Sequence, residues 1–213
     1  PGCAVRLDGD GEILVRGIGT FTGYHNNPEA TAEAFTADGW LRTGDIGSFE
    51  GTERFLRITG RKKELIVTAG GKNVAPAPLE DRLRGHPLVS QVLVVGENRP
   101  CVGALVTLDA EMLPLWLSSH GLEEMTVVDA AQDPRVRAAL ERAVARANEA
   151  VSRAESIRTF KVLPTDFTVA NGLLTPSLKV RRAEAEKRFA AEIDALYTRT
   201  PLVPSAAASP SQE

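Results

Sequence analysis

Cysteine is scarce in this chain of 213 residues. Cys3 and Cys101 form no CxxC pair, and neither stands beside a histidine at metal-ligand spacing. A reducing, cytosolic compartment is therefore the simpler interpretation. The histidines His25, His86 and His120 form no HExxH or triad pattern, so we interpret them as structural or exposed and propose no metal site.

Long apolar runs are also lacking. The longest extend over a few residues, as in Val92 to Val95, far short of the roughly 20 that cross a bilayer. No signal peptide is visible, because the chain opens with Pro-Gly-Cys rather than with methionine and a basic segment. A start without methionine suggests a sequence cut from a longer protein.

A strong positive charge is missing as well. The net charge is −3 and the pI about 5.8, whereas nucleic-acid binding depends on many lysines and arginines that neutralise phosphates. Aromatic residues make up 5% of the chain, which leaves no stacking platform for bases. Nucleic-acid binding through the basic residues around Arg61 and Arg181 is thus a weak third hypothesis.

The residues that are present predict a globular protein, with 43% hydrophobic and 25% charged residues. In the first part we expect strands at 5–7 and 12–16 around an Asp-Gly turn, and a helix from Pro28 to about Phe35 after the cap residue Asn27. Further strands are expected at 53–59 and 64–68, with the basic cluster Gly60-Arg61-Lys62-Lys63 between them.

The second part alternates strand and helix patterns. We expect a Gly-rich loop at 69–73, a helix at 79–84, a β-hairpin at 89–96 and 102–109, a helix after Asp133-Pro134, a strand at 158–163 and a helix at 181–197. The pattern predicts a small α+β domain with a short mixed or antiparallel sheet flanked by helices. Residues 1–60 carry too little apolar surface for a second compact unit and are typical of the β-rich edge of a larger domain.

Two motifs carry candidate chemistry: Gly39-Trp40-Leu41-Arg42-Thr43-Gly44-Asp45 and Thr59-Gly60-Arg61-Lys62-Lys63-Glu64-Leu65-Ile66. A carboxylate after a glycine turn can accept two hydrogen bonds from a vicinal diol, and an arginine can bind hydroxyls or phosphate with its planar fork. Taken singly, an exposed turn aspartate and a solvated basic turn are the simpler interpretations.

These motifs resemble those of the adenylate-forming superfamily, which includes acyl-CoA synthetases, luciferases and peptide-synthetase adenylation domains. The segments GWLRTGD, ITGRKKELI and NGLLTPSLKVRR follow one another in the order of that family. The similarity extends from about Gly11 to Tyr197. The GYHNNPEAT segment and the long insertion between Asp109 and Phe160 are most similar to the long-chain fatty acyl-CoA synthetase branch.

The resemblance implies nucleotide-binding residues at matching positions. Asp45 matches the aspartate that binds the ribose hydroxyls of ATP or the acyl-adenylate, and Arg61 matches an arginine that contacts the nucleotide. Ile58 is expected to line the adenine and ribose side, although an isoleucine in a strand is more often simply core.

The resemblance also implies a hinge at Lys63. Residues 1–62 would then be the remnant of the large N-terminal adenylation domain, residues 63–200 the mobile C-terminal domain and residues 201–213 a disordered tail. A solvated lysine in a basic turn remains an alternative for the Lys63 side chain.

Lys179 matches the lysine that drives adenylation. An ammonium on a flexible stem can hold the fatty acid carboxylate against the α-phosphate and offset the charge that develops there. Without the resemblance, Lys179 would be interpreted as a surface lysine at the start of a helix.

Gly70 and Gly71 lie in a loop that lacks the Walker spacing, since Ile66 and Asn73 stand where a glycine and a Ser or Thr are needed. The resemblance implies that the pantetheine arm of CoA passes these two glycines, and a structural turn is the alternative.

The expected activity is that of an AMP-forming long-chain fatty acid–CoA ligase, which this chain cannot complete alone. The Ser/Thr/Gly-rich phosphate loop and the Tyr-Gly-x-Thr-Glu segment of the family are absent, and so is the acidic ligand of Mg²⁺. Expected partners are fatty acid, ATP, CoA and the missing N-terminal domain, in the cytoplasm or peripherally at a membrane. The alternative is a non-catalytic interaction or nucleotide-binding module of the same fold.

Overall fold

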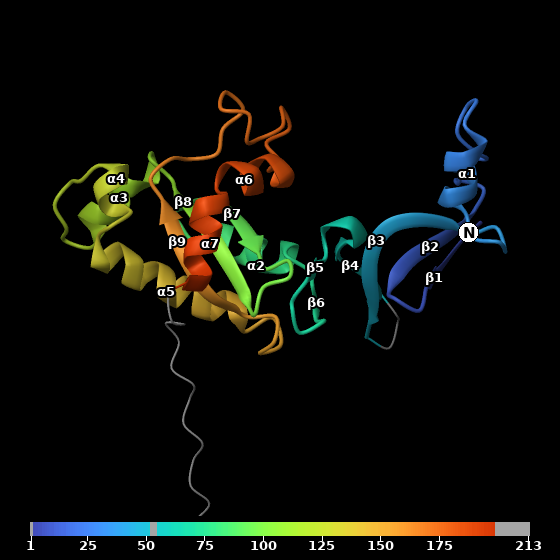
Figure 1. The fold of residues 1–213 in the computed structure, drawn as a ribbon, viewed down its shortest axis with the longest axis horizontal. Helices are drawn as coiled ribbons and strands as arrows, with labels where there is room; N and C mark the ends of the chain where they lie inside the picture. Colours follow the sequence, from blue (N-terminus) through green and yellow to red (C-terminus); the bar gives the residue numbers. More distant parts are fainter. Residues whose placement is uncertain (1, 52–54, 199–213) are drawn as a thin grey trace, which may run out of the picture. The chain divides into compact units, whose positions relative to one another are not determined.

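A computed structural model describes residues 2–51 and 55–198 of the chain. The chain divides between Leu65 and Ile66 into two compact units, which are described separately below (Figure 1). The tail predicted for residues 201–213 lies outside the described residues.

The first unit is built on one antiparallel sheet. Its elements are β1 (Cys3–Leu7), β2 (Glu12–Gly17), α1 (Pro28–Ala34), β3 (Leu41–Glu50), β4 (Phe55–Arg61) and the 3-10 helix η1 (Lys62–Glu64). The strands follow one another in the order β1-β2-β3-β4. The predicted hairpin of β1 and β2 is confirmed, and so is α1, whose first turn is capped because the Asn27 side chain accepts a hydrogen bond from the Ala30 amide.

Few apolar side chains are buried in this first unit. Among its described residues, Ile13, Leu14 and Trp40 are buried, whereas Ile18 is 95% and Phe55 68% exposed. A core of this size contributes little to folding, because hydrophobic stabilisation scales with the apolar area removed from water.

Two predictions need correction: the turn at Asp45 in this unit, and the strand at 64–68, which crosses the boundary between the units. The segment that contains Asp45 belongs to the long strand β3 and is no simple turn, because β2 and β4 pair with it on both sides. The strand predicted at 64–68 is limited to β5 (Ile66–Val67), because the amide of Leu65 bonds back to the carbonyl of Lys62 and closes a helical turn through Glu64.

The second unit combines helices with a mixed sheet. After β5 come β6 (Asn73–Val74), α2 (Ala77–Arg84), β7 (Val89–Val95), β8 (Val102–Leu108), α3 (Met112–Ser119), α4 (Val127–Ala130), α5 (Pro134–Asn148), β9 (Ile157–Leu163), α6 (Arg182–Arg188) and α7 (Ala190–Thr198). β8 lies between β7, which is antiparallel to it, and β9, which is parallel. The predicted α+β class with a short mixed sheet is confirmed.

Helices cover both faces of this sheet: α2 and α5 pack on one face, and α6 and α7 pack on the other (Figure 1). Val92 and Val94 point into a cluster with residues of α2 and α5, while Leu93 and Val95 point into a second cluster with residues of α6 and α7. Because side chains alternate along a strand, a sheet buried on both faces requires a continuous apolar run, which β7 provides.

The last predicted helix differs in one respect from its prediction. The helix expected at 181–197 is interrupted at Phe189, which separates α6 from α7. The predicted inward face is confirmed for Phe189, Ile193 and Leu196, all of which are buried in the second cluster. Helices α3 and α4, which were not predicted, lie in the insertion between Asp109 and Phe160, ahead of the predicted helix α5.

Candidate functional site

Asp45 and Arg61, the two predicted nucleotide-binding residues with charged side chains, lie opposite each other on β3 and β4. The Arg61 Nε stands 3.1 Å from Asp45 Oδ1. The Arg61 side chain is 66% exposed, whereas that of Asp45 is about a quarter exposed. The pair therefore presents a carboxylate and a guanidinium fork together at the surface, a combination that can bind hydroxyls and phosphate.

The backbone before Asp45 leaves the regular ladder. Leu14 pairs with Arg42 and Glu12 with Ile46, so the three residues Thr43, Gly44 and Asp45 face a single residue of β2. Gly44 has φ +72°, in the left-handed region that favours glycine. Such bulges bend a strand and redirect its side chains.

Ile58 follows on β4, opposite Gly47. Its side chain is 62% exposed, so Ile58 does not belong to the core of this unit as described. An exposed apolar side chain on the same strand as Arg61 is able to contact a flat base, and the role of Ile58 toward a nucleotide stays a prediction.

A hollow of about 540 Å³ opens in the first unit beside Arg61. Its lining combines basic side chains with two carboxylates: Arg42, Arg61, Lys62, Lys63, Glu12 and Glu33. A concave surface that gathers several cations attracts anions such as phosphate groups. Asp45 and Ile58 are not among the lining residues.

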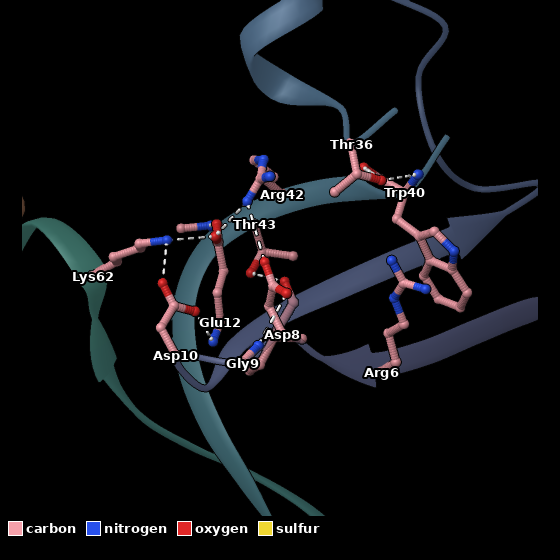
Figure 2. Close-up of polar contacts among 12 residues, drawn as sticks. Arg6, Asp8, Gly9, Asp10, Glu12, Thr36, Trp40, Arg42, Thr43 and Lys62 are labelled. Atoms are coloured by element: carbon pink, nitrogen blue, oxygen red, sulfur yellow. Dashed lines mark hydrogen bonds and ion pairs between the residues drawn. The ribbon is translucent and has the colours of Figure 1, made fainter. Parts of the chain in front are cut away.

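Lys62 is tied to the hairpin of β1 and β2. Its Nζ lies 2.5 Å from Asp10 Oδ2 and 2.9 Å from Glu12 Oε2 (Figure 2). The hydrogen bond that Lys62 donates to Asp10, followed by the one that it donates to Glu12, raises the pKa of Lys62 above its ordinary value of 10.5. Lys63, the predicted hinge, is the next residue and lies exposed in η1.

Gly70 and Gly71 form the turn between β5 and β6. Gly71 has φ +75°, and its amide donates to the carbonyl of Thr68 at 2.8 Å. The structural-turn interpretation is thus confirmed for these residues. A turn does not exclude a path for pantetheine, and the CoA-binding role stays a prediction.

Lys179 lies in a loop of the second unit that is closed at its base. Leu174 and Val180 form a bridge, and Thr175 bonds through its amide to the Lys179 carbonyl at 2.8 Å and through its hydroxyl to the Lys179 amide at 3.1 Å. The side chain of Lys179 is exposed and makes no ion pair with the described residues 66–198 of its own unit. The lysine precedes helix α6, which begins at Arg182.

Arg182 anchors the chain directly after this loop. Its guanidinium lies 2.5 Å from Glu80 Oε1 of α2 and donates to the carbonyl of Val94 at 2.7 Å. Glu80 also accepts the amide of Val94 at 2.8 Å. These bonds connect Arg182, three residues after Lys179, to α2 and β7.

The comparisons with known proteins agree with this geometry. The family described as "AMP-binding enzyme C-terminal domain" matches residues 63–201. The chain belongs to this family. The match includes the loop of Lys179 and the turn of Gly70 and Gly71, whereas Asp45 and Arg61 precede it.

Individual relatives extend the similarity to the first unit. The chain is 52% identical over 200 residues to the long-chain-fatty-acid–CoA ligase FadD15 of Mycobacterium tuberculosis, covering 93% of this chain and 33% of that protein. It is 38% identical over 216 residues to the putative fatty-acid–CoA ligase fadD11 of the same organism, covering 100% and 38%. The chain therefore spans about a third of the length of these relatives.

A solved structure shows the same fold. The A domain of a carboxylic acid reductase from Segniliparus rugosus, in complex with AMP and a co-purified carboxylic acid, superposes with a TM-score of 0.65 at 28% identity. The alignment covers 88% of this chain and 28% of that one. The architecture of this chain is thus that of a part of an adenylation domain.

Sequence reasoning missed Glu12 and Arg42. Glu12 is 3% exposed although it is charged, and it accepts hydrogen bonds from Arg42, Gly44 and Lys62. The sequence did contain a signal for Glu12: it stands at the start of the apolar run of β2. A charged side chain in such a run is buried only if partners compensate its charge. The carboxylates of Asp8, Asp10 and Glu12 lie within 4.8 Å of one another, and Arg42 and Lys62 compensate their charge.

No helix within the described residues is both long and apolar enough to span a membrane.

Proposed function

We propose that this chain is the C-terminal part of an AMP-forming long-chain fatty acid–CoA ligase. The 52% identity with FadD15, which extends over both units, carries this proposal. In the first half-reaction a fatty acid carboxylate oxygen attacks the α-phosphorus of ATP, and pyrophosphate leaves. In the second, the CoA sulfur attacks the acyl carbon of the adenylate, the bond to the phosphate oxygen breaks, AMP leaves and the thiol proton passes to solvent.

In this reaction Asp45 and Arg61 bind the nucleotide. Their 3.1 Å ion pair on adjacent strands orients both side chains, so the Asp45 carboxylate can accept hydroxyl hydrogen bonds of a ribose while the Arg61 fork binds the nucleotide. Ile58 offers an exposed apolar surface on the same strand. The first unit thus contributes to the binding of the substrate ATP. The Mg²⁺ that accompanies ATP is bound by residues outside this chain.

Lys179 acts in the first half-reaction. Its exposed ammonium extends from a rigidly closed loop, which lowers the entropic cost of positioning it. A positive charge near the α-phosphate stabilises the negative charge that develops during attack. Lys179 is the residue of this chain to which we assign catalysis.

The two units correspond to two domains of the enzyme. Residues 1–62 would be the end of the large domain and residues 63–200 the mobile domain, with Lys63 as hinge. The division after Leu65 and the family match from residue 63 support this boundary. A rotation at the hinge presents Lys179 for adenylation or the turn of Gly70 and Gly71 for CoA.

The remainder of the enzyme is the first partner of this chain. The large exposed apolar side chains Ile18 and Phe55 are consistent with a covering domain, which would remove them from water. We place the enzyme in the cytoplasm, either free or peripherally at a membrane. The free thiols of Cys3 and Cys101 are consistent with a reducing compartment.

The test separates the two half-reactions in the full-length enzyme. Lys179→Ala is expected to lower fatty acid-dependent pyrophosphate exchange by about 100-fold or more, because a preorganised charge at the transition state is removed. Thioester formation from supplied acyl-AMP should remain within about threefold of the unmodified enzyme. Lys187→Ala, a change at another exposed lysine of the same unit, serves as the control and should alter neither rate.

Three results would contradict parts of this proposal. Equal loss of both half-reactions in Lys179→Ala would remove the role assigned to Lys179. An unmodified enzyme without pyrophosphate exchange for any acid of a graded chain-length series would overturn the ligase activity and favour a non-catalytic module. A higher rate with carrier-protein pantetheine than with CoA would overturn CoA as the acceptor.

A further inference from the structure

Glu12 is the most deeply buried carboxylate among the described residues, and it lies beside the nucleotide-binding pair. Its side chain is 3% exposed. Oε1 accepts the amide of Gly44 at 3.1 Å, and Oε2 accepts Lys62 Nζ at 2.9 Å and Arg42 Nη1 at 3.3 Å. Figure 2 shows the carboxylate between Lys62 and Arg42. A buried carboxylate with this many donors is held in one orientation.

The bond from Oε1 replaces a missing backbone hydrogen bond of the sheet. At the bulge of β3, Gly44 faces no residue of β2 in register, and its amide therefore lacks a ladder partner. Glu12 supplies that partner. The next amide, of Asp45, bonds to the Thr43 hydroxyl at 3.1 Å, and this hydroxyl donates to the carbonyl of Ile13 at 2.7 Å.

Oε2 accepts hydrogen bonds from Arg42 of β3 and from Lys62, the first residue after β4. Lys62 directly follows Arg61, whose guanidinium pairs with Asp45. Arg42 lies at the other end of the bulge. The Glu12 carboxylate thus binds Gly44, the residue before Asp45, and Lys62, the residue after Arg61. It therefore fixes Asp45 and Arg61 relative to each other.

We propose that Glu12 is the positioning residue of the Asp45–Arg61 pair, and that it controls the affinity of the enzyme for the adenosine part of ATP and of the acyl-adenylate. This inference rests on the proposed function. It assigns to Glu12 no contact with substrate, because its oxygens are occupied by Gly44, Arg42 and Lys62. The bulge of β3 retains its shape only while the Gly44 amide has a partner.

The first experiment uses Glu12→Gln in the full-length enzyme. The glutamine side chain has nearly the same shape but no charge and a single acceptor oxygen, so it cannot accept hydrogen bonds both from the Gly44 amide and from Lys62 and Arg42. The KM values for ATP and for supplied acyl-AMP are expected to rise about tenfold, the size of one lost charge-assisted bond. The KM for CoA and kcat at saturating ATP should stay within about threefold.

Asp10→Asn is the matched control. Asp10 also binds Lys62, at 2.5 Å, but it has no contact with Gly44 or Asp45 among the described residues. Its variant should leave every KM within about threefold. A rise in the KM for ATP as large as that of Glu12→Gln would show that the charge of Lys62, and not the bulge, matters, and would overturn the proposal.

A double-mutant cycle with Asp45→Asn distinguishes positioning from general stabilisation. If Glu12 acts through Asp45, Glu12→Gln should raise the KM for ATP by less than about twofold in the Asp45→Asn enzyme. Independent, multiplicative effects of the two changes would overturn the proposal. Unmodified full-length enzyme without pyrophosphate exchange would instead show that the proposed function fails, which separates the two outcomes.

A second pair of variants applies if Glu12→Gln does not fold. Thr43→Val removes the hydroxyl that bridges Ile13 and Asp45 at nearly constant volume, and Thr43→Ser retains it. The valine enzyme should show the rise in the KM for ATP, and the serine enzyme should not. Equal KM values in both variants would overturn the proposal.

Discussion

At the scale of single residues, charge pairs fix local geometry through short contacts. Asp133 illustrates this at the start of α5, where its carboxylate accepts the amides of Arg135 and Val136 at 2.7 and 3.3 Å and pairs with the Arg135 side chain. These bonds satisfy amides that the helix leaves without partners. The hydrogen bond with Arg135 is the main reason why the pKa of Asp133 falls from 3.8 to about 2.

This pKa leads to a pH-dependent prediction. Because the folded-state pKa lies below the unfolded value of 3.8, the stabilisation by Asp133 is complete above pH 3.8 and is lost as the pH falls through about 2. Asp133→Ala should lower the free energy of unfolding by about 1 kcal/mol at pH 6. Denaturant unfolding of both proteins at pH 6 and near pH 2 measures this difference, and a gap that persists at the lower pH would contradict the assignment.

At the scale of elements, substitutions in the turn between β5 and β6 can separate the effect of backbone strain from an effect on ligand binding. Gly71 has φ +75°, whereas a Cβ added at Gly70 would find no neighbour nearer than the Thr68 hydroxyl oxygen at 4.0 Å. The two glycines are adjacent in sequence but differ in what an added methyl group would cost.

Alanine substitutions at both positions should therefore behave differently. Gly71→Ala is expected to destabilise the protein by about 1 kcal/mol or more, because the left-handed conformation is strained for alanine. Gly70→Ala should leave the free energy of unfolding within about 0.5 kcal/mol. If pantetheine passes this turn, Gly70→Ala should still raise the KM for CoA in the full-length enzyme. An unchanged KM would leave the turn with a purely structural role.

At the scale of the whole molecule, the two units differ in how they bury apolar surface. Both hydrophobic clusters that enclose the sheet of β7, β8 and β9 consist of residues after Leu65. The described part of the first unit buries few apolar side chains and exposes several large ones. Folding free energy depends on such burial, so only the second unit has the core of an independent domain.

Expression of each unit alone tests this difference. A polypeptide of residues 66–213 should unfold cooperatively in denaturant, with helical circular dichroism before the transition. Residues 1–65 alone should show no cooperative transition, since their apolar side chains would stay in water. A sharp transition of the shorter polypeptide would contradict this explanation.

Sequence alone determined the elements whose signals are local. The cap residues Asn27 and Asp133 and the apolar runs of β7 and β8 were sufficient for their helices and strands, because capping and side-chain alternation act over a few residues. Resemblance to a known family supplied the roles proposed for Asp45, Arg61 and Lys179, which composition and periodicity could not provide.

Tertiary structure decided what depends on distant residues. The bulge before Asp45 is a shift in the register between β2 and β3, and the break at Phe189 interrupts a helical pattern that the sequence predicted as continuous. Glu12 obtains its partners from Arg42, Gly44 and Lys62, which are 30 to 50 residues away along the chain. A buried charge is tolerated only where folding brings such donors to it, and no local pattern encodes that meeting.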